Sequence, residues 1–104
     1  MQRASQDYLK NGIALTPSRP QAHDKVTVTY SGLLPQSGAT HVYAHVGFGD
    51  NWRHIHDYEM VKTAGGFEAT VAVVQGDTMH IAFKDCAGHW DNNSGNNYSF
   101  EVWH

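Results

Sequence analysis

The sequence of 104 residues has few basic residues, one cysteine and no long apolar run. Its seven lysines and arginines are scattered, and the formal net charge at pH 7 is -3. Proteins that bind the phosphate backbone of nucleic acids cluster their basic residues, so no nucleic-acid partner is expected. The apolar runs are much shorter than the roughly 18 residues that span a bilayer, so no membrane partner is expected either.

The single cysteine, Cys86, excludes an internal disulfide and leaves the redox compartment open. The N-terminal residues lack the pattern of a signal peptide. We therefore expect an extracellular location if the chain is excised from a secreted enzyme, and a cytoplasmic one if it is free-standing.

Recognisable catalytic motifs are also absent. The sequence has no Gly-x-Ser-x-Gly nucleophile elbow and no glycine-rich phosphate loop before a helix. Carboxylates could pair as in glycosidases, but they fall in or near the loops of a small domain, where little encloses them to separate their pKa values. We expect no catalytic residue and no cofactor, although these carboxylates leave a hydrolase open by count alone: Asp50, Asp57, Glu59, Asp85 and Asp91.

Eight histidines raise the alternative of a small metal-binding or hydrolytic domain. His54 and His56 are spaced like metal ligands, but no second pair follows at a zinc-site spacing. The segment from Asp91 to Gly95 begins like a calcium loop, with its glycine one place early and Val102 where glutamate is required. We expect no metal site.

Apolar and polar residues alternate in short segments, the pattern of strands with one buried face. Glycine and proline turns separate these segments, and no 3.6-residue period is sustained. The sequence predicts an all-β fold, an antiparallel immunoglobulin-like β-sandwich, with residues 1–11 as a flexible N-terminal arm and 12–104 as one module. The predicted strands are 12–16, 25–30, 41–47, 56–62, 67–73, 79–84 and 98–103.

Details of two strands stay open. Pro17 and Pro20 end the first segment, which favours an edge strand. In 56–62 the inward residues are either Tyr58 and Met60 or Ile55 and Val61. Phe48 is expected to fold into the core from a loop over 47–52, and Trp103 to cover a sheet edge.

The segment 87–98 is rich in amide and aromatic side chains and has almost nothing aliphatic. It is predicted to be the last connection of the sandwich and to contribute nothing to the core. Trp90 in this segment and Trp52 in the earlier loop either plug the end of the sandwich or present a ring face to solvent. An exposed indole suits the C–H face of a sugar, and amides such as Asn92 and Asn93 both donate and accept hydrogen bonds to hydroxyls.

Several of these motifs resemble starch-binding modules, most closely carbohydrate-binding module family 25 and its relatives in family 26 and in starch synthases. The resemblance runs from about residue 23 to 103. It depends on HVYAHVGF at 41–48 with Trp52 after it, FKD at 83–85, WDNN at 90–93 and NY at 97–98.

The resemblance implies a β-sandwich that binds α-1,4-linked glucans such as starch, glycogen and maltooligosaccharides. It implies a site made by His45, Trp52, Trp90 and Asn92 or Asn93. Family members usually accompany amylolytic enzymes, so an amylolytic catalytic domain in a parent chain is a further expected partner. The alternative function is an immunoglobulin-like protein-interaction module whose aromatic residues are binding hot spots.

Overall fold

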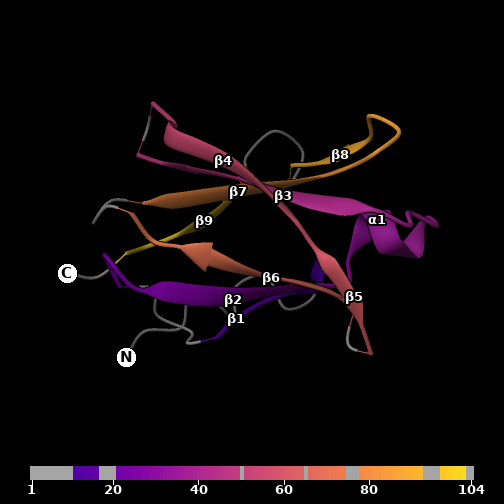
Figure 1. Cartoon of the computed structure of the whole chain (residues 1–104). Helices are drawn as coiled ribbons and strands as arrows, with labels where there is room; N and C mark the ends of the chain where they lie inside the picture. The colour runs from indigo at the N-terminus through magenta and orange to yellow at the C-terminus, as the bar shows by residue number, and fades with distance from the viewer. Residues whose placement is uncertain are drawn as a thin grey trace.

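The computed structural model describes residues 11–16, 21–49, 51–64, 66–74, 78–92 and 97–102, which form two antiparallel sheets packed face to face (Figure 1). One sheet has the order β1 (Ile13–Thr16), β2 (Lys25–Tyr30), β6 (Gly66–Ala72), β5 (Val61–Thr63). The other has the order β4 (Arg53–Glu59), β3 (Val42–Phe48), β7 (Met79–Asp85), β8 (Trp90–Asp91), and β9 (Tyr98–Phe100) also pairs with β7. The predicted all-β antiparallel sandwich is confirmed.

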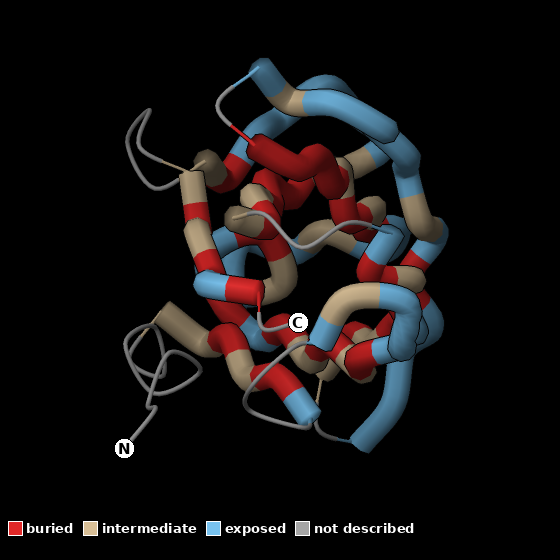
Figure 2. The backbone as a smooth tube through the Cα atoms, turned by 90° about the vertical axis from the view of Figure 1, so that its left-hand side faces the viewer, coloured by how far each residue is buried: buried red, intermediate tan, exposed pale blue. Residues whose placement is uncertain are grey.

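The core lies between the two sheets and follows the predicted alternation. Every second residue of β2, β3 and β7 is buried, and Figure 2 shows buried positions alternating with less buried ones along the strands. Tyr30 from the first sheet stacks on Phe83 from the second, with ring centroids 3.9 Å apart. Because the inward positions are apolar, the intervening residues of β3 and β7 are left on the outer face, and these include His45 and Ala82.

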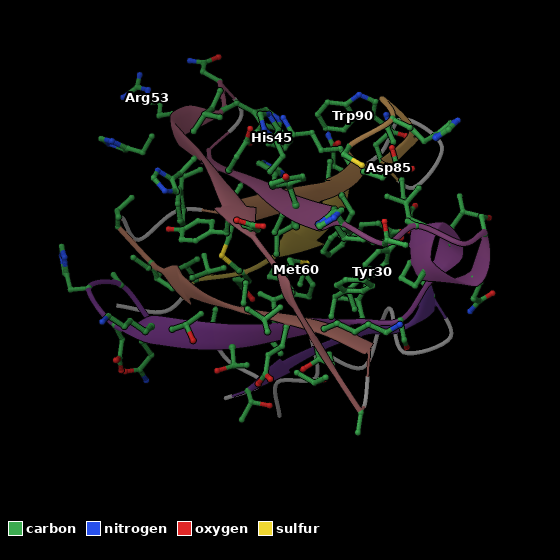
Figure 3. All side chains as sticks on the ribbon, turned by 45° about the vertical axis from the view of Figure 1, so that its right-hand side comes forward. Tyr30, His45, Arg53, Met60, Asp85 and Trp90 are labelled. Carbon is green, nitrogen blue, oxygen red and sulfur yellow. The ribbon has the colours of Figure 1, made fainter. Side chains whose placement is uncertain are left out.

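The predicted strand 56–62 is wrong as a single element. It is two strands, β4 and β5, that belong to opposite sheets, and Met60 lies buried at the crossing between them (Figures 1 and 3). The inward residues are Tyr58 and Met60, the first of the two predicted pairs, because Ile55 and Val61 of the other pair are exposed. Both strands lie at an edge of their sheets, so the chain changes sheet along one side of the sandwich, where the Met60 side chain packs into the core.

Two connections are more ordered than the sequence suggested. The turn around Leu33 and Leu34 is a single helical turn, α1 (Leu33–Gln36), at one end of the sandwich. The segment 87–98 contains β8, and its Asp91 is 7% exposed, so the prediction that this segment contributes nothing to the core was wrong. Phe48 is buried as expected, but as the last residue of β3 rather than in a loop.

The predicted edge strand is confirmed, because β1 ends its sheet and pairs only with β2 in the described structure. Residues 1–10 of the predicted arm, and Trp103, lie outside the described residues. Within the described part of the chain, no helix has the length and apolar character needed to cross a membrane.

Candidate functional site

An open cleft of about 480 Å³ lies on the outer face of the β4–β3–β7–β8 sheet. Figure 3 shows His45 and Trp90 on this outer side of the sheet, away from Tyr30 and Met60 between the layers. The cleft therefore gathers side chains from four strands and the loops beside them. Its lining residues are His45, Trp52, Ile55, Ala82, Trp90, Asn92 and Asn97.

Trp52 reaches this face through an irregularity in the β3–β4 pairing. The register shifts between Val46 and Phe48, so that Gly47 faces two residues of β4. Trp52 itself has φ of 51°, a left-handed conformation that is rare for a bulky residue and costs roughly 1–3 kcal/mol. A Cβ on Gly47 would lie 2.3 Å from Cε3 of Trp52, so the indole occupies the space that the missing side chain leaves.

Two histidines hold the indole of Trp52 in place. It stacks with His45 at a centroid distance of 5.4 Å and with His80 at 5.5 Å. His80 is in turn hydrogen-bonded through Nδ1 to Oγ of Ser99 at 2.8 Å. The position of the Trp52 ring is thus supported by two histidines before any ligand arrives.

Trp90 stands at a steep angle to this stack. Its ring meets His45 edge-on, at 5.4 Å and 87°, whereas His45 and Trp52 differ by 27°. The two indole planes are therefore inclined by at least the difference between 87° and 27°, which is 60°. Nζ of Lys84 lies 5.4 Å from the centroid of the Trp90 ring, within range of a cation–π contact.

Asp91 fastens the strand that carries Trp90. Its buried carboxylate accepts hydrogen bonds from the phenols of Tyr30 at 2.5 Å and Tyr98 at 2.8 Å. Tyr30 belongs to the opposite sheet, so this contact ties β8 across the core. Burial, and then the hydrogen bond to Asp91, raise the pKa of the Tyr30 phenol well above its ordinary value and keep it a donor. Asp91 is occupied by these tyrosines, which argues against the calcium loop considered from the sequence.

Asp57 orders the polar side of the cleft. Its carboxylate is bonded to Nδ1 of His45 through one oxygen and to Nζ of Lys84, at 2.7 Å, through the other. Partial burial raises the pKa of Asp57, but the hydrogen bonds from Lys84 and His45 outweigh it, so the net pKa is below its ordinary value. The carboxylate therefore stays ionised at neutral pH and orients both side chains.

This shift predicts a pH-dependent contribution of Asp57 to stability. Because the pKa of Asp57 is lower in the folded protein, its ionised carboxylate stabilises the fold at pH values above the pKa of the unfolded chain, about 3.9. This stabilisation is lost as the pH falls through the pKa of the folded protein. We expect Asp57→Asn to lower the free energy of unfolding at pH 7 by less than about 1 kcal/mol, because the pair is partly exposed, and to change little near pH 2. Urea titrations at both pH values measure the free energy of unfolding. Glu59→Gln, on the same strand, is the control, because it removes the same charge. An equal effect at both pH values would contradict it.

The structure brings four predicted residues together, His45, Trp52, Trp90 and Asn92, and Asn93 lies outside the described residues. The tryptophans were expected either to plug the end of the sandwich or to face solvent. Both are at least partly exposed to solvent, and Trp90 is 46% exposed.

The sequence did not single out His80, Ala82, Ile55 or Asn97 for this site. The alternation in β7 already placed His80 and Ala82 on the outer face, which was the available signal. Asn97 has φ of 60°, and its N–H donates to the carbonyl of Asn92 at 2.7 Å, so it closes the base of its loop. Among the residues that the structure describes, no three histidine, cysteine or acidic side chains converge to hold a metal ion.

Comparison with known proteins gives the family. Residues 26–83 match the model of a starch/carbohydrate-binding module of family 53, while family 25 in particular is not confirmed. The chain is 37% identical over 90 residues to an α-amylase of Clostridium acetobutylicum, a match that covers 85% of this chain and 11% of that protein. A solved cycloalternan-degrading enzyme from Trueperella pyogenes aligns with 74% of this chain and 10% of its own, at 17% identity and a TM-score of 0.49. The segment that matches the family model is more than half of this chain, so the chain belongs to the starch/carbohydrate-binding modules of family 53.

Proposed function

We propose that the cleft between Trp52 and Trp90 binds α-1,4-linked glucans, such as starch, glycogen and maltooligosaccharides, without cleaving them. The observation that carries this proposal is the angle between the planes of the two exposed indoles. It is at least 60°, the difference between their angles to His45 of 87° and 27°. Coplanar rings suit a flat β-linked chain, whereas inclined rings follow the curve of an α-1,4-linked one. Each indole offers an apolar face to one sugar ring.

The polar groups of the cleft complete the site in this proposal. His45, oriented by Asp57, and Asn92 hydrogen-bond to sugar hydroxyls. Asn93, which the sequence analysis predicts for the same role, stays part of the proposal. Water competes for the same hydroxyls, and the cleft is open, so affinity is roughly micromolar to millimolar. Among the described residues that line the cleft there is no carboxylate, which supports binding without catalysis.

The module then serves to hold an associated enzyme on its polysaccharide. The similarity to an α-amylase, of which the chain spans 11%, supports an amylolytic catalytic domain as that enzyme. A binding domain raises the local concentration of a tethered catalytic domain at the glucan surface.

Isothermal titration calorimetry tests the glucan class. We expect maltoheptaose to bind with a micromolar to millimolar dissociation constant and cellohexaose to show no measurable heat at the same concentrations. Incubation with soluble starch should release no reducing sugar. Equal binding of both oligosaccharides would remove the selectivity for α-linkages, and absence of maltoheptaose binding would remove the function itself.

A further inference from the structure

A larger cleft lies next to the proposed site, at the end of the sandwich. It has a volume of about 820 Å³, against about 480 Å³ for the cleft on the outer face. Its walls are residues 33–34 and 37–40, in and after α1, and residues 85–90, the turn that joins β7 to β8. Trp90, which is 46% exposed, lines both clefts, so the two adjoin at this one side chain.

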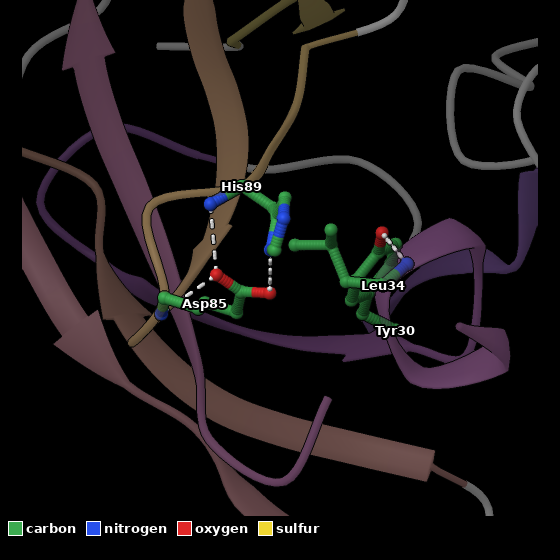
Figure 4. A network of polar contacts seen from close by, with 5 residues as sticks. Tyr30, Leu34, Asp85 and His89 are labelled. Atoms are coloured by element: carbon green, nitrogen blue, oxygen red, sulfur yellow. Dashed lines mark hydrogen bonds and ion pairs between the residues drawn. The ribbon is translucent and has the colours of Figure 1, made fainter. Parts of the chain in front are cut away.

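His89 in this cleft is fixed although its side chain is 72% exposed. Its Nδ1 is hydrogen-bonded to Oδ2 of Asp85 at 2.9 Å, and Oδ1 of Asp85 accepts the backbone N–H groups of Ala87 and His89 at 2.9 and 2.8 Å (Figure 4). The backbone hydrogen bond from His89 is the main cause that lowers the pKa of Asp85, so this acceptor is ionised at neutral pH. Because Nδ1 is bonded to this carboxylate, the other ring nitrogen, Nε2, is the one left to accept a hydrogen bond from a ligand.

An exposed histidine is ordinarily free to rotate in solvent, and surface ion pairs add little stability. Here one carboxylate accepts two backbone N–H groups of the turn and is also bonded to the ring, so it orients His89 at the wall of a cleft. Leu33, 56% exposed on the facing wall, adds apolar surface. An apolar wall, an indole and an oriented acceptor match the two faces of a sugar ring, its C–H patch and its hydroxyls.

We propose that a bound glucan continues over Trp90 into this cleft, where His89 accepts a hydrogen bond from a sugar hydroxyl. The inference rests on the proposed function, because the same chain must first occupy the cleft between Trp52 and Trp90. Longer maltooligosaccharides then gain affinity from the second cleft, and short ones do not.

Calorimetry with two ligand lengths tests this extension. His89→Ala is expected to weaken maltoheptaose about tenfold and to change maltotriose by less than about twofold. His41→Ala is the matched control, because His41 is exposed just before β3 and lines neither cleft. A similar loss for both ligands, or for neither, would overturn the extension, provided that wild type binds maltotriose.

The natural protein offers a second measurement that needs no substitution. Cys86 is the single cysteine of the sequence, is exposed, and lines the second cleft. Saturating maltoheptaose is expected to slow its reaction with Ellman's reagent severalfold, and saturating maltotriose to leave the rate unchanged. Maltoheptaose that binds without protecting Cys86 would refute the extension but leave the glucan site intact. If neither ligand binds, the proposed function itself is wrong.

Discussion

Asp91→Ala is expected to destabilise the fold by about 3 kcal/mol, because it removes the carboxylate that accepts hydrogen bonds from two buried phenols. The carboxylate of Asp91 accepts the hydroxyls of Tyr30, which is fully buried, and of Tyr98, which is 2% exposed. Neither hydroxyl can reach water after the substitution, so each pays the cost of an unsatisfied buried donor. Urea denaturation with linear extrapolation measures the difference.

Two further variants separate the contributions. Tyr98→Phe removes one donor and leaves Tyr30 bound, so we expect about 1 kcal/mol. Tyr30→Phe should cost more, because the N–H of Leu34 also loses its acceptor, the Tyr30 hydroxyl at 3.1 Å. The control is Asp24→Ala, an exposed aspartate whose side chain accepts a hydrogen bond from the neighbouring backbone N–H of Lys25. If Asp91→Ala and Asp24→Ala cost the same, the carboxylate does not tie the sheets together.

The consequence extends to binding, because Asp91 follows Trp90 directly. The two phenols anchor Asp91, the second residue of β8, which is a strand of only two residues. Loosening this strand moves the indole relative to His45, with which it now makes an edge-on contact. A stability determinant in the core thus also sets the inclination of the two indoles.

The sequence predicted the parts of the fold that depend on local pattern. Alternation in β2, β3 and β7 predicts their buried faces, because a strand packed on one side repeats every two residues. The change of sheet at Met60 leaves no such mark, since the alternation around it is mixed and fits two choices of inward residues. The pairing of Trp90 and Asp91 with β7 was equally hidden, because a two-residue strand is too short to show a period.

For the site, the residue types were predictable and their arrangement was not. Trp52 and Trp90 were predicted as indoles in loop segments, and the resemblance to starch-binding modules added His45 and Asn92 or Asn93. The mutual angle of the two indoles depends on long-range contacts: the shift opposite Gly47, the stack on His80, and the phenols around Asp91. No segment of the sequence contains that information by itself.

Trp52 is expected to contribute most to binding. Trp52→Ala should weaken maltoheptaose by about a hundredfold, or about 2.7 kcal/mol, since a central indole is the type of residue that dominates binding energy. The fold should survive, because the ring is only partly buried and the left-handed backbone at φ 51° is no worse for alanine than for tryptophan. The control is Val61→Ala, an exposed apolar residue, 67% exposed, on the opposite sheet, which should bind as wild type does.

Gly47→Ala tests the position of the indole without removing it. The new methyl group would lie 2.3 Å from Cε3 of Trp52, so the ring must move away from the sheet and from its contacts with His45 and His80. We expect about a tenfold loss of maltoheptaose affinity, smaller than for Trp52→Ala, with a shifted tryptophan emission spectrum. Wild-type affinity in a folded Gly47→Ala protein would show that binding does not need the packing of the Trp52 indole against Gly47. If Gly47→Ala loses affinity and Trp52→Ala does not, the ligand contacts the strand rather than the indole. Since both variants act on one contact, Gly47→Ala combined with Trp52→Ala should bind no worse than Trp52→Ala alone.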